Sequence, residues 1–193
     1  MFAKELNLRS QQGVFPREFT SAGLRFVAME NVHSPEFFPI AEIVFPHLQI
    51  EKVTCMLEVG AGTGITPVLA ALHGVNHVVA TDINPAAVEN IRANALLHRA
   101  EDRVEARLGS VYDPIRVGER FDLIYWNFPW FICDLDHEPG YLEQAIYDPG
   151  YRLVRRFCLE AHQYLLPGGR LVMAFSSLVG NFEALRLIAG QGG

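Results

Sequence analysis

The chain has 193 residues, of which half are apolar and a fifth are charged, and its formal net charge is −6. This length and composition favour one globular domain with a substantial core. The acidic balance argues against a broad basic surface for nucleic acid, although a local basic patch remains compatible with it. No apolar run is long enough to span a bilayer, and the charged first residues do not fit a secretory signal peptide.

The segment before residue 50 is expected to form a leader and a helix that cap the site of the main domain. The hydroxyl of Ser34, the following Pro35 and the early acid Glu36 are typical of a helix start. The expected elements here are a loosely structured leader over 1–22, a short strand over 23–30 and a helix over 34–45. The chain is accordingly divided into residues 1–50 and a main domain of residues 51–193.

From residue 54 the pattern alternates between apolar runs and helical periodicity. Strands are expected at 54–59, 77–81, 103–108, 121–126 and 170–175, and helices at 65–73, from Asn84, at 151–166 and at 181–189. Such alternation predicts an α/β fold with a doubly wound, mostly parallel sheet. Asn84–Pro85 is a strong pair for the cap and first turn of a helix.

A glycine-rich loop joins the first of these strands to its helix. Gly60, Gly62 and Gly64 stand at every second position, and the acid Glu58 lies two residues before the first of them. Glycine permits positive φ angles and lets a ligand approach the main chain, and the helix start offers free N–H groups. Ile65 occupies the third small position of the dinucleotide fingerprint, which disfavours a dehydrogenase. A tight turn without a ligand is the alternative.

Polar or glycine residues stand where four of the predicted strands end, at Gly60, Asp82, Gly109 and Asn127. In a parallel sheet these ends meet at one rim, near the switch in strand order where ligands bind. A carboxylate at position 82 suits the two hydroxyls of a ribose. Capping of the next helix is the alternative, but Asn84 already serves that purpose.

The spacing of Glu58 and the three glycines resembles the first motif of class I S-adenosylmethionine-dependent methyltransferases. Asn127-Phe128-Pro129-Trp130 resembles the Asn-Pro-Pro-Tyr type motif of methyltransferases that modify a planar nitrogen. Within that class the chain, over about residues 33 to 176, looks like the small domain methyltransferases. These include the release-factor glutamine and ribosomal RNA guanine-N2 enzymes.

This resemblance implies a Rossmann-like fold and S-adenosylmethionine as cofactor. The implied cofactor-binding residues are Glu58, Gly60, Ala61, Gly62, Gly64, Thr66, Asp82, Ile83, Ser110, Val111 and Asn127. The implied catalytic residues are Asn127, Phe128, Pro129 and Trp130. Glu58 is expected to face the ammonium end of the methionine moiety.

A planar amide or amino nitrogen is a poor nucleophile because its lone pair is shared with a π-system. The side-chain oxygen of Asn127 and the main-chain carbonyl of Phe128 can hold the two hydrogens of such a nitrogen, and Trp130 can stack on the group. Positioning and preorganised dipoles then supply most of the catalysis. Phe128 replaces the first proline of the motif, which removes the rigidity of a double proline. A turn with an aromatic plug is the alternative.

The loop after the third strand of the alternating region departs from the family pattern. Related enzymes often place an acid near position 110 to accept from the adenine amino group, but Ser110 stands here. Asp113 or a backbone group is expected to compensate. The segment 131–149 carries five acids and no Lys or Arg, which favours a neutral or cationic substrate beside the site. A solvated loop is the alternative.

The predicted function is therefore N-methylation of a planar amide or amino nitrogen in a protein or small molecule. A nucleic-acid base methyltransferase, with ribosomal RNA as substrate, and a cofactor-binding module without catalysis remain as alternatives. No membrane partner is expected.

The three cysteines, Cys55, Cys133 and Cys158, fit neither a zinc site nor a disulfide framework, which predicts a reducing, cytoplasmic setting. His137 has no partner histidine at ligand spacing, so no metal site is expected.

The sequence after Ala189 offers only Gly190-Gln191-Gly192-Gly193. The closing strands that are usual in the family are therefore expected to be absent. Their absence would expose a sheet edge. One hypothesis is that a second copy of the chain covers this edge in a homodimer.

Overall fold

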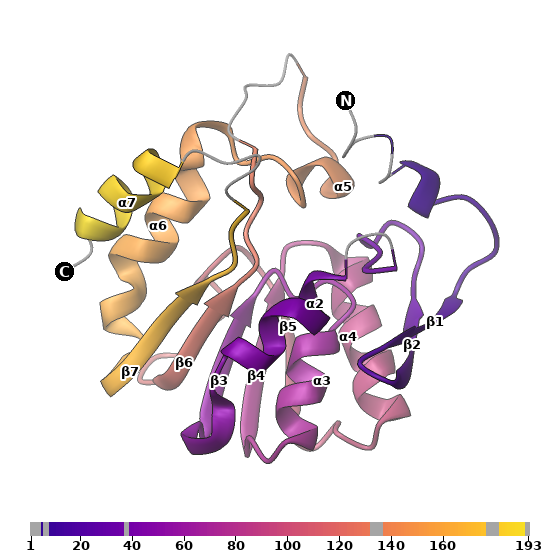
Figure 1. Cartoon of the computed structure of the whole chain (residues 1–193), viewed down its shortest axis with the longest axis horizontal. Helices are drawn as coiled ribbons and strands as arrows, with labels where there is room; N and C mark the ends of the chain where they lie inside the picture. The colour runs from indigo at the N-terminus through magenta and orange to yellow at the C-terminus, as the bar shows by residue number, and fades with distance from the viewer. Residues whose placement is uncertain (1–4, 6–7, 37–38, 132–136, 177–181, 192–193) are drawn as a thin grey trace.

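The computed structural model describes residues 5, 8–36, 39–131, 137–176 and 182–191, and its centre is a five-stranded parallel sheet (Figure 1). The strands are β3 (Cys55–Val59), β4 (His77–Asp82), β5 (Val104–Leu108), β6 (Phe121–Trp126) and β7 (Leu165–Met173). They lie in the order β5-β4-β3-β6-β7, so the strand order reverses between β3 and β6. The predicted α/β class and parallel sheet are confirmed.

Neighbouring residues of each strand point to opposite faces of the sheet, and both sets are apolar. Helices therefore cover both faces. Met56 and Val78 pack with α2 (Ile40–Val44), α3 (Ile65–Leu72) and α4 (Pro85–Leu97) in one apolar cluster. Leu57 and Val79 pack on the other side with α6 (Arg152–Glu160) and α7 (Phe182–Gln191). The four strand residues are fully buried, which explains their continuous apolar runs. The shorter helices are η1 (Phe45–His47), η2 (Ile50–Lys52), α5 (Tyr141–Gln144), η3 (Pro149–Tyr151) and η4 (Ala161–Gln163).

The start of α4 agrees with the prediction. Asn84 is its N-cap, its side-chain oxygen accepts from the backbone N–H of Ala86 at 3.0 Å, and Pro85 occupies the first turn. This cap fixes the helix immediately after Asp82, at the end of β4. The capping alternative for Asp82 is therefore unnecessary.

The expectation of a loose leader over residues 1–22 is wrong for its last part. β1 (Arg17–Ser21) pairs with β2 (Leu24–Ala28) in an antiparallel hairpin, and the turn residues Ala22 and Gly23 both have positive φ. Such a two-residue turn matches the twist of paired strands, but a turn of Ala and Gly is not one of its usual sequence signals. The short strand expected over 23–30 is confirmed as β2.

Two asparagines of α4 hold this hairpin against the main domain. The side-chain oxygens of Asn90 and Asn94 accept from the backbone N–H groups of Met29 and Val27, at 2.8 and 2.9 Å. Their side-chain amides both donate to the carbonyl of Val27 at 2.8 Å. Both asparagines are fully buried, so this docking fixes the start of the segment that follows β2.

The helix expected over residues 34–45 is also wrong at its start. Ser34 and Pro35 lie outside any helix, and α2 begins only at Ile40, with Pro39 at its N-cap position. A proline inside a helix would remove a hydrogen bond and clash with the preceding turn. Pro39 therefore sets the start of the helix, and Ser34 does not cap it.

The helix expected over residues 151–166 and the strand expected over 170–175 have different bounds in the structure. α6 ends at Glu160, and β7 begins at Leu165 rather than at residue 170. Leu165 pairs with Phe121, and the register shifts between Phe121 and Leu123, which lets β7 include the glycines at 168 and 169. β7 is an edge of the sheet formed by the described residues. The homodimer, the cytoplasmic location and the division at residue 50 stay predictions.

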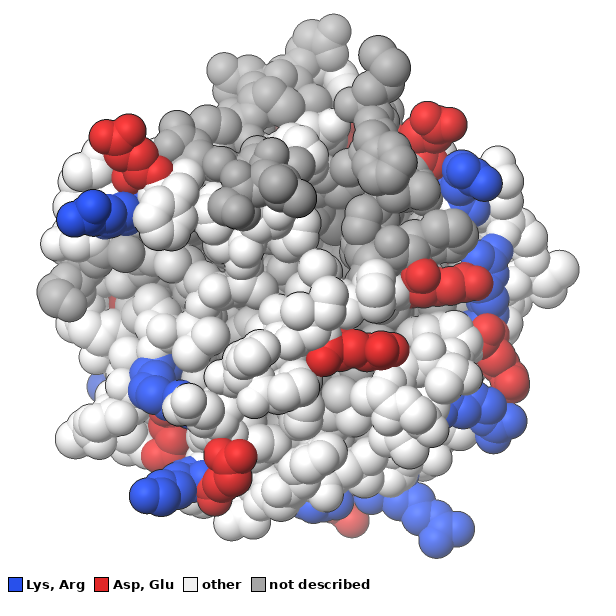
Figure 2. All heavy atoms as spheres, in the orientation of Figure 1, with Lys and Arg blue, Asp and Glu red and all other residues white. Residues whose placement is uncertain are grey.

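Charged side chains on the face drawn in Figure 2 lie mostly around its margin, with both signs interspersed. Among the described residues, this face shows no broad basic region. Within the same described part of the chain, no helix has the length and apolar character needed to cross a bilayer.

Candidate active site

A cavity of about 570 Å³ opens where β3, β4, β5 and β6 end. The loops that follow these strands lie beyond their carboxyl ends, as does α5, at the top of Figure 1. The predicted site residues that line the cavity are Glu58, Gly60, Ala61, Gly62, Thr66, Asp82, Ile83, Ser110, Val111, Asn127, Phe128, Pro129 and Trp130. The convergence expected from the strand ends is therefore present in the structure.

The three glycines of the loop after β3 have different surroundings, although each has a positive φ. A Cβ on Gly60 would lie 2.7 Å from Nε1 of Trp126, whereas a Cβ on Gly62 would meet no atom within 4 Å. A Cβ on Gly64 would lie 2.9 Å from Cα of Ile91 in α4. Gly64 does not line the cavity, and its bare Cα instead permits the close approach of α3 and α4.

Asp82 is held by the main chain on both sides. One of its carboxylate oxygens accepts from the N–H of Gly62 and the other from the N–H of Asn84, each at 2.9 Å. Burial raises the pKa of Asp82 above its usual range, against the opposing effect of these backbone hydrogen bonds. Its carboxyl group is therefore fixed between the glycine loop and the start of α4.

Glu58 is a buried acid with few partners. Glu58 is 4% exposed, and its carboxyl group forms a hydrogen bond with the Thr66 side chain. Its Oε2 atom has no hydrogen-bond partner. Burial raises the pKa of Glu58 well above its usual range, and the nearby charge of Asp82 raises it further. Its free oxygen is suited to a hydrogen-bond donor or a cation entering the cavity.

The tetrapeptide after β6 presents a second unpartnered oxygen. Oδ1 of Asn127 is buried and has no hydrogen-bond partner. The next residue, Phe128, buries its ring almost completely, and Nε1 of Trp130 donates to the carbonyl of Ala174 at 3.3 Å. The segment is therefore anchored by its aromatic side chains, while the asparagine oxygen is buried without a partner.

The loop after β5 contains Ser110 and Asp113, the residues considered for the adenine contact. Ser110 and Val111 line the cavity, and Val111 has a φ of +49°. Asp113 does not line it, because its carboxylate pairs with Arg156 at 2.6 Å on the surface. Compensation for Ser110 by Asp113 therefore has no support in this geometry, which leaves the backbone alternative.

Several cavity residues were not among the site residues named from the sequence, although the segment before residue 50 was expected to cap the site. Val32, His33 and Pro35 follow the docked hairpin, and Tyr141 and Gln144 come from α5. Burial lowers the pKa of His33 to about 4, so its imidazole is neutral at neutral pH. The sequence signal beside His33 was the Ser34-Pro35-Glu36 segment, which was interpreted as a helix start.

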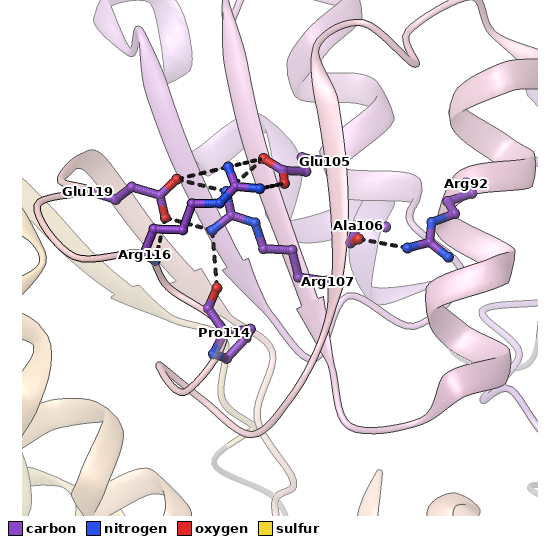
Figure 3. Close-up of polar contacts among 7 residues, drawn as sticks. All are labelled: Arg92, Glu105, Ala106, Arg107, Pro114, Arg116 and Glu119. Carbon is purple, nitrogen blue, oxygen red and sulfur yellow. Dashed lines mark hydrogen bonds and ion pairs between the residues drawn. The ribbon is translucent and has the colours of Figure 1, made fainter.

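A separate polar cluster lies on the edge strand β5, away from the cavity (Figure 3). His77, Glu105 and Glu119 bring possible metal-ligand atoms within 4.8 Å of one another. Arg107 pairs with both carboxylates at 2.6 Å, and Arg116 also pairs with both. Because two guanidinium groups already neutralise these acids, the cluster is an ion-pair network.

Comparison with known proteins points to the same class of enzyme as the resemblance noted in the sequence. A family model described as methyltransferase small domain matches residues 23–191. The chain is 29% identical over 164 residues to a putative protein N5-glutamine methyltransferase of Methanocaldococcus jannaschii, covering 82% of this chain and 81% of that protein. It is 30% identical over 174 residues to the release factor glutamine methyltransferase of Cereibacter sphaeroides, covering 84% of this chain and 60% of that enzyme.

Solved structures share the fold at lower identity. An S-adenosylmethionine-dependent methyltransferase from Agrobacterium tumefaciens has a TM-score of 0.69 and 16% identity, over 94% of this chain and 59% of that one. A Thermus thermophilus 16S rRNA N2 G1207 methyltransferase, in complex with AdoMet and guanosine, has a TM-score of 0.63 and 21% identity, over 88% of this chain and 44% of that one. The chain thus spans less than two thirds of several relatives. It belongs to the methyltransferase small domain family of S-adenosylmethionine-dependent methyltransferases.

Proposed function

We propose that the chain transfers a methyl group from S-adenosylmethionine to a planar carboxamide nitrogen, with a glutamine side chain of a protein as the favoured acceptor. The observation that carries this proposal is the buried Oδ1 of Asn127, which has no partner and belongs to a residue that lines the cavity. A buried acceptor without a donor is costly in a folded protein unless a ligand supplies that donor.

The cavity fits the proposed cofactor by its chemistry. The carboxylate of Asp82 suits the ribose hydroxyls, and the main chain at Gly62, where a Cβ would meet no atom within 4 Å, is open to close approach. The unpartnered Oε2 of Glu58 suits the ammonium group of the methionine moiety. Of the described residues that line the cavity, none is Lys or Arg, so positive charge on a ligand meets no repulsion there.

S-adenosylmethionine supplies a methyl group activated by a positively charged sulfur. The acceptor nitrogen forms a bond to the methyl carbon with its lone pair, the methyl–sulfur bond breaks with its electrons left on sulfur, and the nitrogen then loses one hydrogen as a proton to water. Asn127 Oδ1 and the carbonyl of Phe128 hold the two N–H groups and so aim the lone pair. The ring of Trp130 provides a flat apolar surface for the carboxamide plane.

A protein-bound amide is favoured over other acceptors by the charge of the cavity. The described lining residues include no cation that would pair with a phosphate or with the carboxylate of a free amino acid. The two curated relatives described above are named as protein or release factor glutamine methyltransferases. A nucleic-acid base and a module without catalysis remain the alternatives to be tested.

The test compares Asn127→Ala with Asn76→Ala, an exposed asparagine far from the cavity. Each protein is titrated with S-adenosylhomocysteine and NAD by calorimetry, and is assayed with labelled cofactor against intact proteins and glutamine peptides. We expect Asn127→Ala to reduce methyl transfer by at least about a hundredfold while its S-adenosylhomocysteine affinity stays within about threefold. NAD should not bind, and Asn76→Ala should match the wild type.

Equal loss of methyl transfer and cofactor affinity in Asn127→Ala would contradict the assigned role. Cofactor binding without methyl transfer from the wild type to any acceptor would favour a module without catalysis. Transfer to RNA but not to protein would move the acceptor to a nucleic-acid base.

A further inference from the structure

The tetrapeptide of residues 127–130 has Phe128 where the related motif has its first proline. The packing of the Phe128 side chain takes the place of the rigid proline ring. The Phe128 side chain is 2% exposed. Its ring centroid lies 6.1 Å from that of Tyr151 in an edge contact and 5.9 Å from that of Phe175 in a stacked contact. Trp126 adds a second edge contact at 6.3 Å. Packing on three sides therefore restrains residue 128 through its side chain rather than through its backbone.

Tyr151 contacts this tetrapeptide a second time, through its hydroxyl group. The hydroxyl donates to the main-chain carbonyl of Trp130 at 3.1 Å, and the residue is 2% exposed. One side chain thus restrains the tetrapeptide at two points, the ring of Phe128 and the carbonyl of Trp130. The carbonyl of Phe128 and the side chain of Asn127, which the proposed reaction uses, belong to this same restrained segment.

The backbone of Tyr151 is itself held in an unusual conformation. Its φ and ψ are 51° and 41°, in the left-handed region that bulky residues seldom adopt. The preceding Asp148 is 1% exposed, and its carboxylate accepts from the backbone N–H groups of Leu153 and Val154 at 3.1 and 2.9 Å. Unusual backbone conformations persist where the surroundings determine them and cluster at functional sites. The turn that precedes α6 is therefore fixed in the conformation that points Tyr151 at the tetrapeptide.

We propose that Tyr151 is a positioning residue that holds residues 127–130 in place of the missing proline, by its ring on Phe128 and its hydroxyl on the carbonyl of Trp130. The restraint itself is a property of the folded chain, and its consequence for methyl transfer rests on the proposed function. Tyr151 acts through Phe128 and Trp130 on the direction in which Asn127 and the Phe128 carbonyl face an acceptor nitrogen.

The test pairs Tyr151→Phe with Tyr112→Phe as a matched control. Tyr112 is 1% exposed, its hydroxyl also donates to a main-chain carbonyl, that of Phe157 at 2.8 Å, and its ring stacks on Phe157 and Tyr164, which lie outside the tetrapeptide. Hydrogen exchange is measured by mass spectrometry on fragments that cover residues 127–131 and residues 110–114. We expect about tenfold faster exchange over 127–131 in Tyr151→Phe and unchanged exchange there in Tyr112→Phe.

Further measurements separate positioning from a general loss of stability. The affinity of Tyr151→Phe for S-adenosylhomocysteine should stay within about twofold of the wild type, and its kcat for methyl transfer should fall by about tenfold. Unchanged exchange over 127–131 in Tyr151→Phe, or equal acceleration in both variants, would overturn the proposal. Because exchange needs no acceptor, it decides the role of Tyr151 even where the wild type transfers no methyl group and the proposed function fails.

Discussion

Glu58 and Asp82 place two carboxyl groups in one cavity, but their partners differ. Asp82 accepts from two backbone N–H groups, whereas Glu58 has the hydroxyl of Thr66 and one oxygen without a partner. Burial without a cation favours the protonated form of a carboxyl group. Burial raises the pKa of Glu58 well above its usual value of 4.5, so its protonated form is favoured when no cation lies beside it.

This protonation state predicts a coupling between cofactor binding and proton release. An ammonium group near Glu58 stabilises its carboxylate and lowers its pKa, so binding should release up to about one proton at pH values between the bound and free pKa. Calorimetric titration with S-adenosylhomocysteine at a series of pH values above 4.5, in two buffers of different ionisation enthalpy, measures the number of protons released. Glu58→Gln should remove the dependence on buffer.

A ligand control separates Glu58 from Asp82. Methylthioadenosine carries the ribose but lacks the ammonium group, so its binding should release no proton through Glu58. Release of the same number of protons with methylthioadenosine, or by Glu58→Gln with S-adenosylhomocysteine, would assign the proton to another group.

Individual site residues were predictable where chain order alone determined their position. Asp82 and Asn127 end parallel strands, and such ends meet at one rim whatever the side-chain packing. The positions of His33 and Tyr151 depend on how distant segments dock, which no local pattern reveals. Tyr151 contacts residues more than twenty positions earlier in the chain. Its backbone is left-handed, but the residue is neither glycine nor asparagine, the residues that usually indicate this conformation in a sequence.

At the scale of elements, long strongly patterned segments were predicted well and short segments near proline were not. β6 and the capped start of α4 agree with the sequence prediction because an apolar run and an Asn-Pro pair are strong local signals. α2 was misplaced because Pro39 prevents the helix from including Ser34. The β1–β2 hairpin was missed in part because it is held by Asn90 and Asn94, whose buried hydrogen bonds are tertiary contacts.

The edge strand β5 has an electrostatic support that can be tested separately from the cavity. The Arg107 side chain is 8% exposed and pairs with Glu105 and Glu119 (Figure 3). Removing it would leave two neighbouring carboxylates short of their main partner. We expect Arg107→Met to lower the free energy of unfolding at neutral pH by about 3 kcal/mol, measured by urea denaturation.

The stabilisation that Arg107 provides is expected to decrease at low pH. Hydrogen bonding to Arg107 lowers the pKa of Glu105 to about 2 in the folded chain, below its usual value of 4.5. The resulting stabilisation is present above pH 4.5 and is lost as the pH falls toward 2, so the difference between wild type and Arg107→Met should shrink over that range. Arg25→Met is the control, because the exposed Arg25–Glu18 pair at 3.7 Å should contribute less than about 1 kcal/mol. Equal losses in both variants would contradict a special role for Arg107.

At the scale of the whole molecule, the distribution of charge bears on the class of acceptor. The net charge is −6, and none of the described residues that line the cavity is Lys or Arg. The described residues on the face drawn in Figure 2 have both signs of charge interspersed and form no broad basic region. The likeness to a ribosomal RNA methyltransferase structure is at 21% identity and concerns the fold. One fold supports many acceptors, so the acceptor has to be argued from the site.

Weak binding to RNA is therefore expected from the molecule as a whole. Non-specific affinity for nucleic acid comes from lysine and arginine contacts to phosphate, which release counterions and make binding steeply dependent on salt. A labelled RNA oligonucleotide, followed by fluorescence anisotropy at about 50 mM salt, should show no saturable binding up to about 100 μM protein. Cofactor-saturated protein should behave in the same way, since a cationic ligand bound between Glu58 and Asp82 leaves the outer surface unchanged. Micromolar binding that weakens steeply with added salt would instead reveal a basic patch on another face and would make a nucleic-acid base the acceptor to pursue.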